Sequence, residues 1–570
     1  MKKILGYLTP YKKLILKGLS VKSFATIMEL FLPWLLAYMI DFIIPTKSIP
    51  KVLLYGALML GSSLLALGGN VLANRMAARI SSDAIRDLRD DAYKHIMTFS
   101  NRSVDRFTIP SLISRMTTDT YHIYRMFNVI QRIGIRAPIL LLGSIVMMLF
   151  IDTYLAFVLI ALLPIITWVI IWISRKGIPF YNRLQTSLDQ LIRVVRENIT
   201  GIRIIKALAK EDYEQTKFDG VNEDVSRKER TAGYVIASLN PLMNLILNGG
   251  LVLILGIGAY RVTEGLSKSG SILAFLTYFG LILNSFLAIN RIFLLFSRSN
   301  ASSERIAMIL DEKEEVVLVE SEISDEACFI EFKNVSFSYN QTKADLENIS
   351  FAIRRGSTFG IIGSTGSGKS TIAQLLLRFY EIDEGSIWVG GRDIRSYDVH
   401  ALRRKFGVVF QQDALFSTSV KENIQFGRDV ELNMVQDAAE MAQARPFIEQ
   451  LQDQYEAKVL RSGANFSGGQ RQRMLIARAL ADRPEIIILD DAASALDYQT
   501  DAKLRQAIKQ HTHATTILIA QRISTVLHAD QILVLEEGQV VGLGSHQELA
   551  QTCPLYQELM ALQLGGSENE

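Results

Sequence analysis

Long apolar runs, separated by intervals of unequal length, dominate the first half of the chain. An α-helix needs about 20 apolar residues to cross a ~30 Å hydrocarbon layer. Six runs reach this length and predict six transmembrane helices, at about residues 16–44, 52–72, 133–151, 154–173, 234–260 and 272–296. From Glu326 onward the pattern changes to short β-type runs, glycine turns and charged helical stretches, which is typical of a soluble α/β domain.

The intervals between the predicted crossings differ in length and in charge. Residues 74–132 and 174–233 form long intervals, and the others are short. Basic residues crowd the first long interval: Arg75, Arg79, Arg86, Arg89, Lys94, Arg102, Arg106, Arg115 and Arg125. The positive-inside tendency places this interval, and with it both termini, in the cytoplasm. We therefore expect an integral protein of the cytoplasmic (plasma) membrane, bacterial in origin.

The start of the chain and the change in pattern set the expected domains. Residues 1–13 mix lysines with apolar residues, which suits an interfacial elbow helix, although a frayed basic tail is the alternative. No removable signal peptide is expected, because the first apolar run is too long for one. We expect a transmembrane domain over 14–310, a charged linker over 311–327 and a second domain over 328–570.

Composition argues against two other classes of protein. The net charge is +3, from 61 basic and 58 acidic residues, and does not support a broad nucleic-acid-binding face. Cys328 and Cys553 are the only cysteines, which excludes a disulfide scaffold.

Polar residues inside the predicted crossings need a partner or water. Asn240, Asn244 and Asn248 share one helix face, and Asn284 and Ser285 lie on the last crossing. They either line a water-filled pathway or join helices to one another. Glu29 is costlier to bury, and we expect it to face the cavity or a partner. The mostly apolar pathway, with aromatics such as Tyr38, Phe275 and Tyr278, suggests hydrophobic or amphiphilic cargo.

The second domain contains a complete phosphate-binding loop between a strand ending at Ile362 and a helix over Ile372–Arg378. The loop consists of Gly363, Ser364, Thr365, Gly366, Ser367, Gly368, Lys369, Ser370 and Thr371. Its glycines let consecutive backbone N–H groups surround phosphate oxygens, Lys369 neutralises phosphate charge, and the Ser370 hydroxyl binds magnesium. Asp490 closes an apolar strand and points toward the same magnesium. ATP and Mg²⁺ are the predicted cofactors.

A polar glycine turn before the helix Met474–Leu480 adds a second motif, made of Ser467, Gly468, Gly469 and Gln470. This turn resembles the signature sequence of ATP-binding cassette (ABC) proteins, which read Leu where this chain has Phe466. The whole chain resembles an exporter half-transporter of that superfamily, of the type IV, multidrug-exporter-like kind. The expected fold is therefore a polytopic α-helical membrane domain with six helices plus an α/β P-loop nucleotide-binding domain.

The resemblance implies further roles. Tyr339 looks like the aromatic residue that stacks on adenine, and Gln411 like the glutamine that senses γ-phosphate, magnesium and the membrane domain. Ser370, Gln411 and Asp490 are then the metal-binding residues. Ser494–Asp497 looks like the D-loop. The cytoplasmic loops are expected to end in short coupling helices that rest on the nucleotide domains.

Two departures from the family pattern lie at one phosphate. Asp491 stands where the family has the glutamate that orients or deprotonates the attacking water, and its side chain is shorter by one C–C bond, ~1.5 Å. Gln521 stands where the family has a switch histidine, and it can donate a hydrogen bond but cannot carry positive charge. We expect a degenerate site that binds ATP and cleaves it slowly.

Because the family's nucleotide domains pair head to tail, a degenerate site with an intact signature predicts an asymmetric heterodimer. Its partner should carry the glutamate and the histidine. The expected function is ATP-driven export of hydrophobic or amphiphilic compounds, with multidrug export suggested by the resemblance. An ATP-gated regulatory or channel-like ABC protein and a lipid flippase are the alternatives.

Overall fold

The computed structural model describes residues 1–312, 328–340, 344–411, 413–492 and 496–564. The chain forms two compact units, the first made of Met1–Met97 and Pro110–Glu312, the second of Thr98–Ile109 and Lys313–Glu570. The segment Thr98–Ile109 thus groups with the second unit, although the sequence places it between two predicted crossings. The predicted linker lies outside the described residues from position 313 onward.

The first unit is helical throughout its regular elements. Its helices are α1 Lys2–Leu5, α2 Lys12–Tyr38, α3 Ile49–Met97, α5 Ile109–Ser114, α6 Thr120–Arg132, α7 Arg136–Ile151, α8 Thr153–Ile160, α9 Leu163–Thr200, α10 Ile202–Ala207, α11 Glu211–Ala237, α12 Leu239–Thr263 and α13 Ser269–Leu310. Short 3₁₀ turns at Gly6–Tyr11 and Ile44–Thr46 and π turns at Met39–Ile43 and Arg115–Asp119 connect some of them.

In the part of the chain that the structure describes, five helical stretches are long and apolar enough to cross a membrane. They are Lys2–Thr46, Ile49–Met97, Ile109–Ile151, Asn244–Thr263 and Ser269–Leu310. The predicted crossing over 154–173 is divided between α8 and α9, with Pro164 in the first turn of α9, where a missing N–H costs nothing. Several side chains of this stretch lie outside the described residues.

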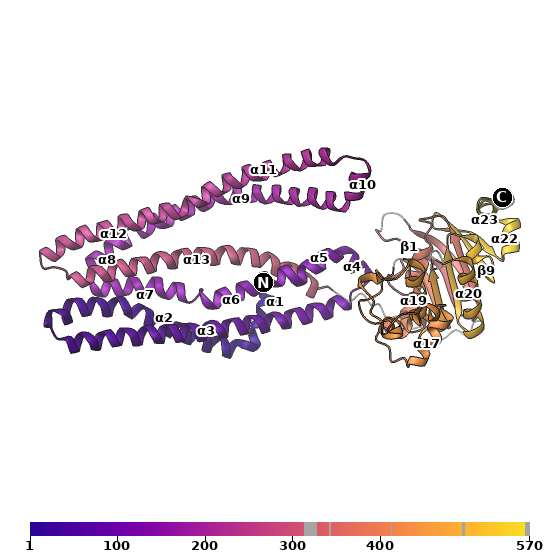
Figure 1. The fold of residues 1–570 in the computed structure, drawn as a ribbon, viewed down its shortest axis with the longest axis horizontal. Helices are drawn as coiled ribbons and strands as arrows, with labels where there is room; N and C mark the ends of the chain where they lie inside the picture. Colours follow the sequence, from indigo (N-terminus) through magenta and orange to yellow (C-terminus); the bar gives the residue numbers. More distant parts are fainter. Residues whose placement is uncertain (313–327, 341–343, 412, 493–495, 565–570) are drawn as a thin grey trace. The chain divides into compact units, whose positions relative to one another are not determined.

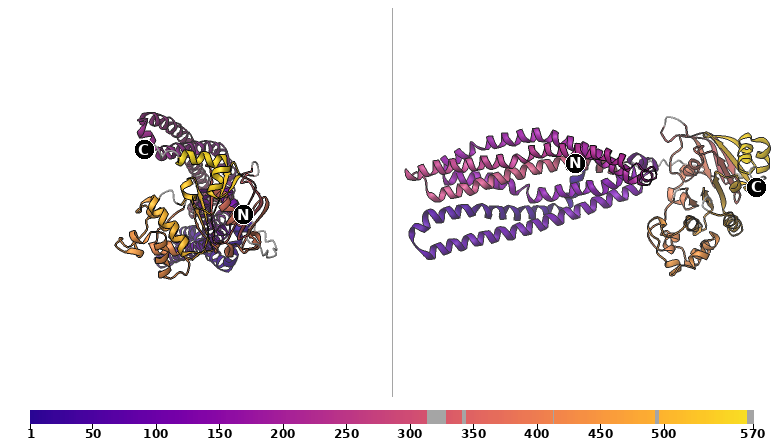
Figure 2. Two further views of the ribbon diagram at one scale, coloured as in Figure 1. Left: turned by 90° about the vertical axis from the view of Figure 1, so that its right-hand side faces the viewer. Right: turned by 45° about the horizontal axis from the view of Figure 1, so that its top comes forward.

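Several helices continue far beyond their apolar runs. Helix α3 has 49 residues, which corresponds to roughly 75 Å at 1.5 Å per residue, more than twice the hydrocarbon thickness. Helices α9 and α11 run side by side and are joined through α10 (Figures 1 and 2). The two long polar intervals of the sequence are therefore largely helical extensions of the crossings.

The core of the first unit contains two aromatic residues that the sequence suggested as pathway residues. Phe275 and Tyr278 of α13 are both 0% exposed. The Tyr278 hydroxyl donates a hydrogen bond to the Leu30 carbonyl at 2.7 Å. The assignment of these two side chains to the pathway was wrong, because within one chain they pack between α13 and its neighbours. The third suggested aromatic residue, Tyr38, stacks on Phe42 with ring centroids 4.9 Å apart.

Charged and polar side chains pair inside the same unit. Glu29 of α2 accepts two hydrogen bonds from the guanidinium of Arg136 of α7, at 2.6 and 3.2 Å. Lys22 is 3% exposed, and its ammonium donates to Asn70 at 2.7 Å and to Asn74 at 3.1 Å. Glu29 thus has a charged partner within its own chain, and this pair joins two crossings.

The polar residues predicted to line the pathway differ in their exposure. Asn244, Asn248 and Asn284 are exposed in the single chain. Ser285 is buried, and its hydroxyl donates to the Leu281 carbonyl of its own helix at 2.7 Å. The Asn240 side chain lies outside the described residues.

The second unit is built on two sheets. Its strands are β1 Ile330–Phe337, β2 Leu346–Ile353, β3 Thr358–Gly363, β4 Glu384–Val389, β5 Arg392–Asp393, β6 Phe406–Val409, β7 Ile486–Asp490, β8 Thr515–Ala520, β9 Gln531–Glu536 and β10 Gln539–Gly544. Its helices are α4 Asn101–Phe107, α14 Lys369–Leu376, α15 Val399–Arg403, α16 Val420–Gln425, α17 Leu432–Met441, α18 Arg445–Ile448, α19 Gly468–Leu480, α20 Tyr498–His511, α21 Ile523–Val526, α22 His546–Thr552 and α23 Pro554–Leu564.

The larger sheet places the ends of its central strands together. Its order is β10-β9-β3-β8-β7-β6, with β9, β3, β8, β7 and β6 parallel. Strands β7 and β8 are buried at every position, as central parallel strands covered on both faces are. The smaller antiparallel sheet has the order β2-β1-β4-β5. The carboxyl ends of β3, β7 and β8 meet at one edge, where open α/β sheets bind ligands.

Candidate nucleotide-binding site

The phosphate-binding loop connects β3 to α14 in a conformation that requires its glycines. Gly366 and Gly368 have φ values of 84° and 95°, in the left-handed region that favours glycine. A Cβ on Gly363 would lie 2.2 Å from the Leu535 carbonyl oxygen of the neighbouring strand β9. The loop can therefore approach an anion closely with its backbone, and α14 presents its N-terminus to the same place.

Lys369, at the start of α14, is 8% exposed and lies against its own loop. Its ammonium donates to the carbonyl oxygens of Gly363 at 2.9 Å and Ser364 at 2.6 Å. Burial lowers the pKa of this ammonium, and the charges of Asp490 and Asp491 oppose that shift. The lysine is a buried cation held at the mouth of an anion-binding loop.

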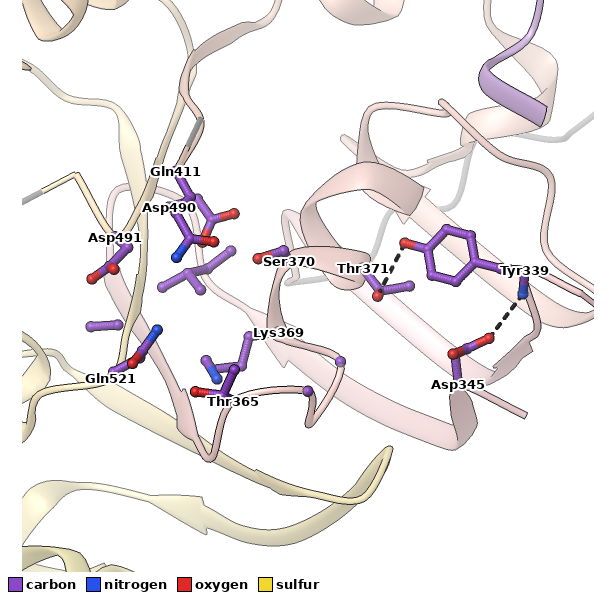
Figure 3. Close-up of a pocket in the computed structure, with 14 residues that line it drawn as sticks. Tyr339, Asp345, Thr365, Lys369, Ser370, Thr371, Gln411, Asp490, Asp491 and Gln521 are labelled. Atoms are coloured by element: carbon purple, nitrogen blue, oxygen red, sulfur yellow. Dashed lines mark hydrogen bonds between the residues drawn. The ribbon is translucent and has the colours of Figure 1, made fainter. Parts of the chain in front are cut away.

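Two consecutive carboxylates follow β7. The Ser370 hydroxyl donates to Asp490, and burial raises the pKa of the Asp490 carboxyl. Asp491 has a left-handed φ of 51°, and its N–H donates to the Ile519 carbonyl at 2.8 Å. Burial also raises the pKa of Asp491, against the opposing charges of Arg522 and Lys369. The sharp turn at Asp491 directs the two carboxylates from one strand end into one pocket (Figure 3).

This pocket has a volume of about 270 Å³ and gathers most of the predicted residues. Its lining consists of Tyr339, Asp345, Thr365, Gly366, Gly368, Lys369, Ser370, Thr371, Gln411, Asp490, Asp491, Ile519, Ala520 and Gln521. Asp491 and Gln521 lie toward one end, Tyr339 lies at the other, and Ser370 and Lys369 lie between them (Figure 3). Residues that lie far apart in the sequence, from Tyr339 to Gln521, thus meet at one site.

Tyr339 occupies the end of the pocket away from the carboxylates. Its hydroxyl lies 2.7 Å from the Gln374 amide oxygen and 3.2 Å from the Thr371 hydroxyl. Its ring meets the Tyr380 ring edge to face, with centroids 5.1 Å apart. Burial raises the pKa of the Tyr339 phenol, which stays neutral at physiological pH.

The signature motif does not line this pocket. Ser467 caps α19 by accepting from the Gln470 N–H, and the Gln470 side chain in turn accepts from the Ser467 N–H at 2.9 Å. Gly468 lines a different hollow, beside Gln411. Phe466 is 8% exposed and packs against Phe447, with ring centroids 6.2 Å apart. The unusual aromatic in the motif is therefore a core residue.

Two site features have no sequence motif. Asp345 lines the pocket and accepts a hydrogen bond from the Tyr339 N–H at 2.9 Å. Gln563, near the end of α23, holds the backbone on both sides of Arg522. No local pattern marks either residue, and the contacts of Gln563 join segments that only the fold brings together. Part of the predicted D-loop, Ser494 and Ala495, lies outside the described residues.

The donor atoms of the pocket fit a hard cation. Ser370, Gln411 and Asp490 offer hydroxyl, amide and carboxylate oxygens, which are ligands that Mg²⁺ prefers. Among the residues described, no group of three or more His, Cys, Asp or Glu could hold a metal ion.

Comparisons with known proteins give the family. Residues 15–286 match the family model described as ABC transporter transmembrane region, and 346–494 match the model described as ABC transporter. An uncharacterized ABC transporter ATP-binding protein of Bacillus subtilis, YfiB, is 35% identical over the full length of both chains. One from Mycobacterium tuberculosis is 33% identical over 98% of this chain and 97% of its own.

A solved structure of a bacterial Atm1-family ABC exporter with ATP bound superposes with a TM-score of 0.79. The two are 24% identical, and the match covers 98% of each chain. This likeness establishes the exporter fold, with a helical membrane domain fused to a P-loop nucleotide-binding domain. The chain therefore belongs to the ABC transporter family.

Proposed function

We propose that this ABC transporter chain is the hydrolysis-impaired subunit of a heterodimeric exporter. As a family member it is an integral membrane protein that binds ATP and couples it to transport. Asp491 and Gln521 line the same pocket as Lys369, and this observation supports the role of a hydrolysis-impaired subunit. Both departures from the family pattern thus act on one nucleotide.

The length of Asp491 limits what it can do to water. A positioned general base contributes about 10²–10⁴ in rate, and it must lie within hydrogen-bond reach of the proton that it removes. The backbone at Asp491 is fixed by its hydrogen bond to Ile519, so the strand end cannot shift freely to replace the missing methylene. The carboxylate falls short by ~1.5 Å, and cleavage slows while binding is retained.

Gln521 alters a second interaction at the end of the pocket that holds Asp491. A neutral amide can donate a hydrogen bond to a phosphate oxygen, but it supplies no positive charge for the transition state. Lys369, Ser370 and the glycine loop are intact, so ground-state binding of ATP keeps its main contacts. The pocket then holds ATP for long periods and acts as a hinge between the two nucleotide domains.

The intact signature supports a partner with a competent site. The reciprocal hydrogen bonds of Ser467 and Gln470 order the N-terminus of α19, whose N–H groups would face a nucleotide held by the other subunit. That partner is a second ABC half-transporter with the glutamate and histidine that this chain lacks. Hydrolysis occurs mainly at the site formed by the partner's P-loop and this chain's signature.

Ser370, Gln411 and Asp490 would hold Mg²⁺ in the proposed site. When bound, it would neutralise phosphate charge. Side chains of this subunit have three roles in the site. Lys369 binds phosphate, Asp490 orients the Ser370 hydroxyl, and Tyr339 supports the adenine base of ATP. Gln411 lines both this pocket and the hollow beside Gly468, so one side chain borders both the nucleotide and the signature helix.

The proposed cargo is hydrophobic or amphiphilic and moves out of the cytoplasm, with the nucleotide unit and both termini on the cytoplasmic side. The apolar crossings and the exposed amides of Asn244, Asn248 and Asn284 support a mixed apolar and polar pathway. The resemblance to multidrug-exporter-like half-transporters suggests multidrug export.

Co-expression with candidate partner chains tests the proposal. Inside-out membrane vesicles containing the pair should accumulate hydrophobic dyes when ATP is added, and vanadate trapping should label the partner's P-loop site far more than this one. A homodimer of this chain alone should bind ATP and hydrolyse it slowly. Brisk turnover by the homodimer, with both pockets trapped equally, would contradict the asymmetric model.

A further inference from the structure

Gln563 of α23 makes two hydrogen bonds with the loop that carries Gln521. Gln563 of α23 donates from its amide nitrogen to the Gln521 carbonyl at 3.0 Å. Its amide oxygen accepts from the Ile523 N–H at 2.8 Å. One carboxamide thus bridges two backbone groups that lie 42 and 40 residues earlier in the chain.

These two hydrogen bonds bracket Arg522, at the corner where β8 leads into α21. Gln521 on one side lines the nucleotide pocket. Arg522 on the other side of that peptide group carries a charge that acts on the Asp491 carboxyl. The bridged segment therefore contains one residue that lines the pocket and one charge that acts on the carboxylate of Asp491.

Helix α21 needs a hydrogen-bond acceptor at its start. Ile523 is its first residue, and the preceding Arg522 makes no side-chain cap. The first N–H groups of a helix have no acceptor within the helix and require one from outside. The Gln563 oxygen fills this role for Ile523. At the other end of the segment, the Arg505 guanidinium donates to the carbonyls of Ser524 and Thr525 at 3.1 and 3.2 Å.

Helix α23 is itself well anchored. Tyr556 in its first half is 0% exposed, and its hydroxyl lies 2.8 Å from His546 Nδ1. Cys553, just before the helix, is 3% exposed. Gln563 is on the exposed side of the helix, so its hydrogen bonds compete with water and add little to global stability. Their main effect is on the position of the loop.

We propose that Gln563 is a positioning residue for the nucleotide pocket, and that α23 acts through it as a clamp on the Gln521 loop. The clamp fixes the backbone on both sides of Arg522 and so sets how closely Gln521 approaches the nucleotide. This proposal rests on nucleotide binding in this pocket, but it does not depend on the asymmetric pairing. Movement of the chain's C-terminal helix would then change nucleotide affinity from a distance.

Three variants of the full-length protein separate the clamp from general effects of altering α23. Gln563→Leu removes both hydrogen bonds, whereas Gln563→Glu keeps an acceptor for Ile523 and loses the donor to Gln521. Gln557→Leu is the matched control, because Gln557 lies on the same helix and its amide donates to the Ala550 carbonyl at 3.0 Å, away from the loop. Thermal unfolding should be nearly unchanged in all three.

The readouts are hydrogen–deuterium exchange of the peptide containing Ile523 and the affinity for a fluorescent ATP analogue. Gln563→Leu should accelerate exchange and weaken binding roughly three- to tenfold, the effect of losing one or two modest hydrogen bonds. Gln563→Glu should be intermediate, and Gln557→Leu should match the unaltered protein. These results together would support the clamp.

Unchanged exchange in Gln563→Leu would overturn the clamp, and faster exchange with unchanged affinity would overturn its role in nucleotide binding. The failure of the proposed function looks different. In that case the unaltered homodimer cleaves ATP rapidly, whatever the Gln563 variants do to the loop.

Discussion

The Tyr380 hydroxyl donates a 2.6 Å hydrogen bond to the Asp105 carboxylate of α4. Helix α4 lies between α3 and α5 in the sequence but belongs to the nucleotide unit. The Tyr380 ring also meets Tyr339 edge to face, at 5.1 Å and 89°. A direct chain of contacts therefore runs from this connecting segment to the end of the nucleotide pocket.

Replacing Tyr380 by Phe should separate the two contacts, because the ring stays against Tyr339 while the bond to Asp105 is lost. We expect nearly unchanged ATP affinity and a two- to fivefold loss of substrate-stimulated ATPase activity, about the effect of one solvent-exposed hydrogen bond at the lower end of the usual range. Tyr397→Phe is the control, since its hydroxyl bonds to the Val389 carbonyl at 2.8 Å instead. Equal stimulation in both variants would argue against a role in coupling.

The double change Asp491→Glu and Gln521→His should restore cleavage in this pocket. The longer carboxylate reaches the attacking water and the imidazole can carry charge, so we expect ATP turnover at this site to rise by about 10²–10⁴-fold, the contribution of a positioned base. Vanadate trapping at this site measures the gain. Adding Lys369→Ala to the repaired chain should abolish the gain, and a flat rate with retained ATP binding would refute the geometric explanation.

The Phe466 ring should matter for stability more than for cleavage. It is 8% exposed and pairs edge to face with Phe447. Phe466→Leu, which creates the residue usual in the family, should cost about 1 kcal/mol through loss of the aromatic pair. Phe466→Ala should cost about 3–5 kcal/mol through the cavity that it leaves. Unfolding of the purified protein, followed by tryptophan fluorescence, checks this order, and a Leu variant less stable than the Ala variant would contradict it.

On acidification, magnesium-dependent nucleotide binding should weaken at a higher pH than it would with an aspartate of ordinary pKa. Burial raises the pKa of Asp490, so its carboxylate is charged above that raised pKa and is lost as the pH falls through it. Binding is therefore strong at neutral pH, and it begins to decline at a pH above the ordinary aspartate pKa of about 3.9. Titration of fluorescent ATP with Mg²⁺, with Asp490→Asn as the control that lacks this carboxyl group, measures the shift. Equal pH profiles for the two proteins would exclude Asp490 as the titrating group.

The ion pair between α2 and α7 should govern assembly of the membrane unit. Arg136→Ala leaves the Glu29 carboxylate without its two hydrogen bonds and should lower the yield of folded protein. Both side chains are partly exposed in the single chain, so the loss should be below the 3–5 kcal/mol of a fully buried pair. Glu29→Gln with Arg136→Gln removes both charges and should recover much of the yield in size-exclusion profiles. A double variant worse than either single change would count against the pairing.

The order of motifs along the chain determined the family fold and most of the nucleotide pocket. The phosphate-binding loop is contiguous, and its glycines are needed for local backbone reasons, so Gly366, Gly368 and Lys369 could be placed from sequence alone. Asp490 followed from its position after a continuous apolar strand. The substitutions at Asp491 and Gln521 were visible as residue types before any geometry was known.

Only the tertiary structure decided which side chains meet across long separations. Phe275 and Tyr278 are aromatic residues of the kind expected along a transport pathway, yet both are fully buried. Helix packing selects the face that each helix turns inward. The Asp105–Tyr380 bond joins residues 275 positions apart, and Gln563 reaches back 42 positions to Gln521. Periodicity and propensity act over a few neighbouring residues, so such contacts arise only when the chain is folded.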